Sequence, residues 1–232
     1  MTIIQINLQQ VQARMAAACQ AAGRDPGTVS LLAVSKTFGP ETVQSAWAAG
    51  QTAFGENYIQ EAVQKITALR QLPDANRAPL QWHCIGPIQS NKTRLVAEHF
   101  DWVHTVDRLK IAERLSEQRP AGLAPLQVCI QVNVDGGPTK SGVLPQEALA
   151  LALQVAALPG LRLRGLMSIP ELATDFVAAT QVFMRVKTLF DALNGSGLAL
   201  DTLSMGMSAD LEAAIHGGST MVRVGSAIFG AR

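Results

Sequence analysis

Eight short apolar runs alternate along the chain with longer amphipathic segments, and this alternation constrains the fold more than any other feature. The apolar runs lie at residues 29–35, 52–56, 81–86, 101–106, 126–134, 161–169, 201–207 and 221–225. Helical patterns lie at residues 40–49, 58–72, 91–99, 108–119, 145–157, 175–193 and 208–216. Alternating strands and helices are typical of parallel α/β folds, and eight strands predict a (β/α)8 TIM barrel. An open, doubly wound sheet shows the same local alternation, so the preference for the barrel rests on the count of eight strands.

A further helix is predicted before the first apolar run. Residues 4–22 carry apolar positions at helical spacing, and Gly23 followed by Asp25-Pro26-Gly27 stops the pattern. The chain ends just after the eighth run, so we expect this helix to supply the closing helix of the barrel. We therefore expect residues 1–232 to form a single domain, with the barrel at residues 29–230.

The composition indicates a globular protein and argues against several kinds of partner. Hydrophobic residues make up 48% of the 232 positions and the net charge is +1, which excludes disorder and leaves no basic patch for nucleic acid or an anionic membrane. The amino terminus shows no signal peptide, so we expect a cytoplasmic location. The three cysteines Cys19, Cys84 and Cys129 are widely spaced and lack a CxxC pattern, which favours free thiols over disulfides or a metal site.

Functional groups of such barrels gather where the strands end, at their carboxyl termini. Polar side chains that directly follow an apolar run are therefore the candidates for a site, whereas polar residues inside helices mostly are not. The residues at these strand ends are Lys36, Asn57, His83, Gly86, Asp107, Asn133, Ser168, Met207, Ser208, Arg223, Gly225 and Ser226.

Lys36 ends the first and most apolar run, in LLAVSKT. Partial burial at the barrel mouth would favour its neutral amine, which is the form that attacks an aldehyde to make an imine. The alternative is a lysine whose stem lies along the strand end while its ammonium reaches solvent. Lys36 alone does not decide between these two interpretations.

The last two strand ends resemble the phosphate site that many barrels build there. Ser208 precedes the predicted helix ADLEAAI, so its hydroxyl and the helix amides can face an anion, although it could also be a plain helix cap. Gly225 and Ser226 follow the eighth run and offer a close backbone approach and a hydroxyl donor. In the segment at residues 217–220, Gly-Gly-Ser-Thr is interpreted as a helix stop and turn.

Arg223 alternates with Val222 and Val224 in the eighth run, so it points to the opposite face of that strand. If that face is the barrel interior, a permanently charged donor is held there for a ligand. If it is the outer face, Arg223 is a surface arginine.

Seven ordered motifs give the chain a resemblance to a known family: AVSKT, FGENY, WHCIGPIQSNK, KSGV, GLMSIP, LSMGMSADLEAAI and GSTMVRVGSAIFG. They are distributed from residue 33 to residue 230, so the match extends over nearly the whole chain, and together they resemble the pyridoxal phosphate homeostasis proteins. The resemblance implies the TIM barrel of fold type III pyridoxal 5'-phosphate (PLP) proteins, which looks like the barrel half of a bacterial alanine racemase. It also implies a PLP-binding protein of vitamin B6 homeostasis.

The resemblance also implies roles for single residues. Lys36 matches the lysine that forms the internal aldimine, and Arg223 matches the arginine beside the pyridine nitrogen. Many relatives carry threonine where this chain has Ser226, but the hydroxyl is retained. Lys140, in KSGV, resembles a second amine near the mouth, a possible transit point for the cofactor, or is a solvated loop lysine. The residues that the resemblance places around the cofactor are Lys36, Asn57, His83, Ser168, Met207, Ser208, Arg223, Gly225 and Ser226.

His83 has two interpretations. It falls in the WHCIG motif and could support Arg223 or the cofactor ring, or it could be a core histidine bonded to backbone.

Binding of PLP does not by itself imply catalysis. Arg223 can only donate a hydrogen bond, which favours an unprotonated pyridine and a weak electron sink. The chain has one tyrosine, Tyr58, and we expect no extra β domain of the kind with which racemases supply a second acid or base. We therefore expect buffering and delivery of PLP, no catalytic residues and no metal, a monomer, and apoenzymes as transient recipients. The alternatives are a low-activity amino-acid racemase and a cofactor-free lysine aldolase acting on a phosphosugar.

Overall fold

Eight parallel strands close into a barrel in the computed structural model, which describes residues 2–71, 78–137, 140–171 and 173–230. Each strand pairs with its neighbours in sequence, and β1 also pairs with β8, so the sheet has no edge. The strands are β1 (Ser30–Val34), β2 (Ala53–Glu56), β3 (Gln81–Cys84), β4 (Trp102–Val106), β5 (Leu126–Gln131), β6 (Leu161–Met167), β7 (Thr202–Ser204) and β8 (Met221–Val224). The predicted TIM barrel is confirmed, and an open doubly wound sheet is excluded.

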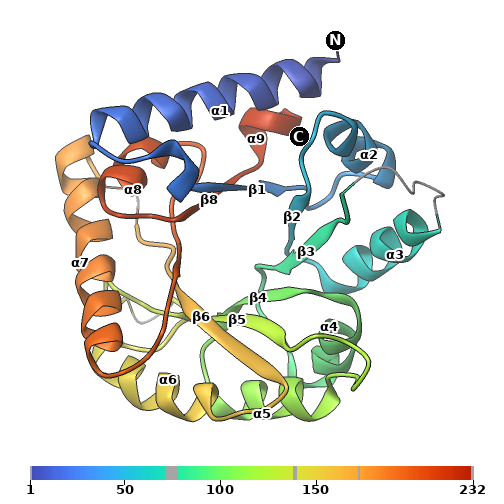
Figure 1. The fold of residues 1–232 in the computed structure, drawn as a ribbon, viewed down its shortest axis with the longest axis vertical. Coiled ribbons are helices and arrows are strands. Elements are labelled where there is room, and N and C mark those ends of the chain that lie inside the picture. The colour runs from blue at the N-terminus through green and yellow to red at the C-terminus, as the bar shows by residue number, and fades with distance from the viewer. Residues whose placement is uncertain (1, 72–77, 138–139, 172, 231–232) are drawn as a thin grey trace.

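Helices surround the barrel and follow the predicted segments closely (Figure 1). Short 3₁₀ turns lie at Pro26–Thr28, Ser90–Lys92 and Pro145–Glu147. Leu72, at the end of the third predicted helix, lies outside the described residues. The helices are α1 (Ile3–Ala21), α2 (Pro40–Ala48), α3 (Ile59–Arg70), α4 (Thr93–His99), α5 (Leu109–Gln118), α6 (Ala148–Ala156), α7 (Phe176–Gly195), α8 (Leu211–His216) and α9 (Ser226–Phe229). No helix of these described segments is long and apolar enough to cross a membrane.

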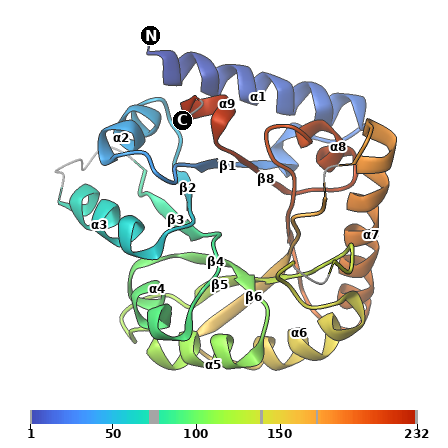
Figure 2. The same ribbon diagram turned by 180° about the vertical axis from the view of Figure 1, so that it is seen from behind.

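The amino-terminal helix α1 lies across the outside of the barrel beside α8 and α9, as both face-on views show (Figures 1 and 2). Its buried face includes Leu8, Val11 and Met15, which join the main hydrophobic core. The predicted amino-terminal helix is therefore confirmed, and it packs on the last helices of the chain, as expected of a helix that closes the barrel. The single turn α9, which follows β8, was not predicted.

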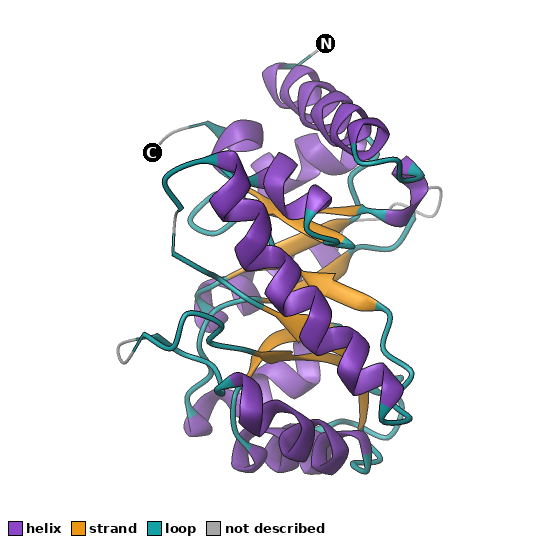
Figure 3. Cartoon of the chain, turned by 90° about the vertical axis from the view of Figure 1, so that its left-hand side faces the viewer, coloured by secondary structure: helices purple, strands orange, loops and turns teal. Residues whose placement is uncertain are grey.

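The helices lie outside the strands of the barrel, as the side view shows (Figure 3). Buried apolar side chains form the main core of the protein. Val222 and Val224 of β8 are fully buried in this core. Because side chains alternate along a strand, Arg223 between them points into the barrel. The interior prediction for Arg223 is thus confirmed, and the surface alternative is excluded, since its side chain is 4% exposed.

Candidate functional site

A pocket of about 420 Å³ opens at the carboxyl ends of the strands, where barrel folds place their sites. Its walls come from the ends of β1, β2, β3, β6, β7 and β8. Seven of the nine predicted cofactor-binding residues line it, namely Lys36, Asn57, Met207, Ser208, Arg223, Gly225 and Ser226. The topology therefore brings together residues that are up to 190 positions apart, counted from Lys36 to Ser226 (226 − 36).

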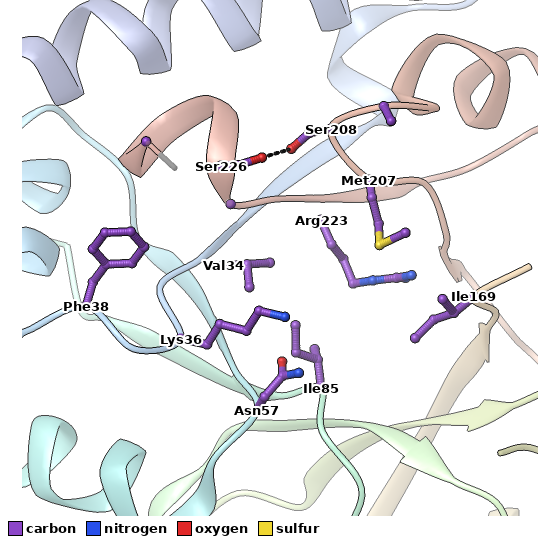
Figure 4. A pocket seen from close by; sticks show the side chains of 13 residues that line it. Val34, Lys36, Phe38, Asn57, Ile85, Ile169, Met207, Ser208, Arg223 and Ser226 are labelled. Atoms are coloured by element: carbon purple, nitrogen blue, oxygen red, sulfur yellow. Dashed lines mark hydrogen bonds between the residues drawn. The ribbon is translucent and has the colours of Figure 1, made fainter. Parts of the chain in front are cut away.

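Lys36 lies two residues after the end of β1, and its half-buried side chain reaches into the pocket toward Asn57 (Figure 4). Within the described part of the chain, no side chain or carbonyl accepts a hydrogen bond from Lys36 Nζ. Asn57 Oδ1 is buried and also has no described partner. A bound ligand at this wall would therefore meet a free amine and a free amide oxygen.

Ser208 and Ser226 lie side by side on the pocket wall opposite Lys36, and their Oγ atoms are 3.4 Å apart (Figure 4). The backbone of Gly225 lies in the same wall and adds no side chain. Two hydroxyls and a backbone segment without a side chain thus lie together at the ends of β7 and β8, where they could donate hydrogen bonds to an anion.

The helix predicted at residues 208–216 begins later than expected, and the alternative of a plain helix cap at Ser208 is excluded. The helix α8 begins only at Leu211, and Asp210 occupies the cap position. The Met207 N–H donates to Asp210 Oδ1 at 2.5 Å, and the Asp210 N–H donates to the Met207 carbonyl. These two bonds close a turn before the helix, because a carboxylate competes well for backbone donors. Ser208 stands on that turn with its hydroxyl free to face Ser226.

Arg223 reaches the pocket from the barrel interior. It is a cation, and no described carboxylate pairs with it. Its NH1 donates to Ser204 Oγ at 2.8 Å and its NH2 donates to the Ser168 carbonyl at 3.0 Å. Burial lowers the pKa of Arg223 to about 10, partly opposed by Asp210. The guanidinium is therefore still charged near neutrality, and both bonds that hold it use neutral acceptors.

A chain of buried hydrogen bonds runs from Arg223 into the barrel interior. Ser204 Oγ lies 2.8 Å from His104 Nδ1, and His104 Nε2 lies 2.9 Å from His83 Nδ1. The His83 ring stacks on Trp102, with ring centroids 5.2 Å apart, and the Arg164 guanidinium lies 4.7 Å from the centroid of Trp102. The barrel interior beneath the pocket is thus polar and aromatic.

The donor and acceptor roles along this series of hydrogen bonds follow from Arg223. Arg223 can only donate, and the other described partner of Ser204 Oγ is His104 Nδ1, so the Ser204 hydroxyl is satisfied by donating to that nitrogen. His104 then carries its proton on Nε2 and donates to His83 Nδ1, which leaves the proton of His83 on Nε2. His83 Nε2 is buried without a described partner.

His83 and His104, the two histidines of this hydrogen-bonded series, are neutral. Burial lowers the pKa of His83 to about 3. Burial, His83 and Arg223 together lower the pKa of His104 well below its ordinary value. Two neutral rings beside Arg223 add no second buried charge.

Two predicted cofactor-binding residues and one predicted second amine lie outside the pocket lining. His83 sits deeper in the barrel and is linked to Arg223 through His104 and Ser204. Ser168 offers Arg223 its carbonyl, while its hydroxyl donates to the Val132 carbonyl. Lys140 donates to Asp135 Oδ2 at 2.9 Å in an ion pair.

Sequence reasoning missed the apolar walls of the pocket and the residues that support Arg223. Phe38, Ile85 and Ile169 line the pocket from the β1, β3 and β6 ends. His104 and Ser204 lie within strands, and period-two alternation places them on the inner face. That alternation was the available signal, but it does not show which inward side chains meet.

Comparison with known proteins agrees with this geometry. Residues 6–232 match a family model described as the alanine racemase N-terminal domain. The pyridoxal phosphate homeostasis protein of Pseudomonas aeruginosa is 60% identical over 232 residues, which cover 100% of this chain and 97% of that protein. The one from Escherichia coli K12 is 52% identical over 226 residues, covering 97% and 95%.

Solved structures give the same result. PipY of Synechococcus elongatus with PLP bound superposes with a TM-score of 0.83 at 36% identity, covering 98% of this chain and 100% of that one. Alanine racemase of Corynebacterium glutamicum shares the fold, with a TM-score of 0.69 at 19% identity, over 99% of this chain and 61% of that one.

Fold and site together define a lysine-bearing (β/α)8 barrel of the alanine racemase type. Within that class, the chain belongs to the pyridoxal phosphate homeostasis protein family.

Proposed function

We propose that this chain binds PLP covalently, as an imine with Lys36 Nζ, and buffers and delivers the cofactor in the cytoplasm. The observation that carries the proposal is the free amine of Lys36 in one pocket with the uncompensated cation of Arg223 and the hydroxyl pair. The relatives named for pyridoxal phosphate homeostasis and the PLP-bound PipY structure support the same ligand.

The residues present fit PLP in charge and chemistry. Ser208, Ser226 and the Gly225 backbone would hold the phosphate, and Arg223 would donate to the ring nitrogen. Asn57 stands beside Lys36 with its buried Oδ1 unpaired. When bound, PLP supplies an aldehyde that condenses with an amine, releasing water, and a ring that can withdraw electrons.

The same residues favour holding the cofactor over fast catalysis. A strong electron sink needs a protonated ring nitrogen, which a carboxylate partner stabilises, whereas Arg223 can only donate. Among the described residues that line the pocket there is no carboxylate, histidine or tyrosine, so the lining offers no second acid or base beside Lys36. Tyr58, the single tyrosine, is 54% exposed and does not line the pocket. We therefore propose binding without strong racemase activity.

The decisive experiment is a visible absorption spectrum of the purified chain followed by borohydride reduction and peptide mapping. We expect a yellow protein with the pyridoxyl label on Lys36, and loss of both in Lys36→Gln. Lys140→Gln is the matched control and is expected to keep the label. A colourless protein that stays colourless with added PLP, or a label only on Lys140, would overturn the proposal and reopen the cofactor-free aldolase.

The proposed lack of strong catalysis has its own measurement. Incubation of the PLP-loaded chain with L-alanine in D2O is expected to leave Cα deuterium near the level of free PLP. Rapid incorporation that disappears in Lys36→Gln would identify a racemase-type enzyme instead.

Delivery requires that the imine be reachable by other amines and proteins. Ser226 is exposed at the pocket edge and Lys36 is half-buried, so incoming amines can approach the imine. We expect a PLP-requiring apoenzyme to gain activity from the loaded chain at free PLP concentrations too low to activate it. We also expect the chain to be a monomer, which light scattering checks.

A further inference from the structure

The residue after Lys36 has an unusual backbone conformation. Thr37 has φ of +67°, and no other described non-glycine residue has a positive φ. This left-handed conformation is unfavourable for β-branched residues and persists only where the surroundings impose it. Something in the structure therefore holds the chain at Thr37, one residue from the proposed imine.

Two hydrogen bonds hold the backbone on either side of Lys36. The Thr37 N–H donates to Glu61 Oε1 at 2.8 Å, and Lys65 Nζ donates to the Ser35 carbonyl at 2.9 Å. Glu61 and Lys65 are one turn apart on α3, with 3.7 Å between Lys65 Nζ and Glu61 Oε1. Side chains of the single helix α3 thus hold the backbone of Ser35 and of Thr37, the residues on either side of Lys36.

A buried ion pair between Lys65 of α3 and Glu56 of β2 attaches this part of α3 to the barrel. Lys65 Nζ lies 2.6 Å from Glu56 Oε1, and the Ser35 hydroxyl donates to the same oxygen at 2.6 Å. The side chains of Lys65 and Glu56 are 3% and 0% exposed. Burial raises the pKa of Glu56 and the charge of Lys65 opposes that rise.

The ion pair lies behind the barrel wall, between the strands and α3. Glu56 alternates with Gly55, whose Cα faces Ile85 and Leu32 on the inner side, so Glu56 points outward to α3. Lys36 reaches into the pocket on the other side of the same wall. Buried ion pairs are poor sources of stability compared with apolar packing, so a positional role accounts for one at this place better than a stabilising role does.

We propose that Glu61 and Lys65 are positioning residues that set the direction of the Lys36 side chain by holding Thr37 in its left-handed conformation and Ser35 against α3. The inference rests on the proposed function, because it concerns the placement of the amine that would bind PLP. Neither residue touches the pocket, so both act through the backbone beside Lys36.

The test compares Glu61→Ala, which removes the acceptor for the Thr37 N–H, with Glu61→Gln, which keeps an acceptor oxygen. We expect the dissociation constant for PLP to rise about tenfold in Glu61→Ala, the usual scale for a lost charge-assisted hydrogen bond, and to stay close to wild type in Glu61→Gln. Adding Thr37→Gly to Glu61→Ala is expected to recover most of the affinity, because glycine adopts positive φ without strain. Glu98→Ala is the matched control, since Glu98 pairs with Arg94 at the same spacing and at 3.7 Å on α4.

A second readout needs no PLP. Formaldehyde and cyanoborohydride label the amines of the apo chain, and mass spectrometry gives the rate at Lys36 relative to the other lysines. We expect Glu61→Ala to speed labelling of Lys36 because the released amine spends more time in solvent, and Glu61→Gln and Glu98→Ala to leave the rate unchanged.

Equal behaviour of Glu61→Ala and Glu98→Ala in the labelling experiment would overturn the inference, and so would the absence of recovery by Thr37→Gly. A wild-type chain that forms no imine with PLP would instead defeat the proposed function. The labelling rates would still decide the positioning role in that case.

Discussion

At the residue scale, the positive charge of Arg223 stays uncompensated because its described hydrogen-bond partners are neutral groups. Its two described partners are a hydroxyl and a backbone carbonyl, and the hydroxyl of Ser204 in turn depends on the neutral ring of His104. A carboxylate in either place would compensate the charge and weaken its interaction with a ligand. The interior of the barrel thus leaves the positive charge of Arg223 available to the pocket.

Replacing Ser204 with alanine tests this dependence. Ser204→Ala leaves Arg223 NH1 and His104 Nδ1 without their partner in a buried place, so we expect the free energy of unfolding to fall by about 1 to 3 kcal/mol. Urea denaturation followed by circular dichroism measures the change. Ser45→Ala, which removes an exposed hydroxyl bonded to the Glu41 carbonyl, should change little. Equal costs for both variants would contradict the role given to Ser204.

The buried histidines predict a pH dependence of stability. Their folded pKa values lie below the ~6.5 of an unfolded chain, so between these values the unfolded chain binds more protons than the folded one. Their contribution to stability is therefore present above about pH 6.5 and is lost as the pH falls below it. We expect ¹⁵N NMR to show neutral His83 and His104 rings, protonated on Nε2, down to about pH 5. A ring that titrates near its ordinary pKa would contradict this prediction.

At the element scale, the close approach of β6 and β7 depends on a missing side chain. A Cβ on Gly165 would lie 1.8 Å from the Thr202 carbonyl oxygen, and Gly165 pairs with Thr202 in the strand register. The β7 strand is only three residues long, so it has few other bonds with which to keep its place. This contact lies in the wall that carries Ser204 toward Arg223.

Gly165→Ala is therefore expected to cost at least the 1 to 3 kcal/mol that is roughly typical of overpacking, because the neighbouring atom is backbone and cannot move aside. Thermal unfolding measures the loss. Gly195→Ala is the control, because its Cβ would meet no atom within 4 Å at the end of α7. Tolerance of alanine at position 165 would mean that β6 and β7 are farther apart than described.

At the scale of the whole molecule, α1 joins the first residues of the chain to its last elements. Arg14 of α1 donates to both carboxylate oxygens of Glu212 on α8 and to the Ser208 carbonyl, which belongs to the pocket loop. Leu8 and its neighbours on the same face are buried against α8 and α9. The helix thus packs on α8 and α9 and also supports the loop that would hold the phosphate.

Leu8→Ala is expected to lower the free energy of unfolding by about 2 to 5 kcal/mol, because the side chain is 2% exposed and leaves a cavity. Urea denaturation measures the loss. Ile3→Ala on the same helix, with Ile3 69% exposed, should be close to neutral. A small cost for Leu8→Ala would mean that α1 is only loosely attached to the barrel.

The sequence by itself determined the barrel, its strand ends and seven of the residues that line the pocket, since hydrophobic periodicity reports local conformation and parallel strands end on one side. Ser208 shows the limit of local reasoning, because the Asp210 carboxylate closed a turn where a helix start was expected. Only the tertiary structure decided that Arg223 donates a hydrogen bond to Ser204. It also decided that Lys65, inside a helix, donates to the backbone beside Lys36. Those contacts depend on strand register and on how the barrel closes, which bring residues far apart in the sequence within hydrogen-bonding distance.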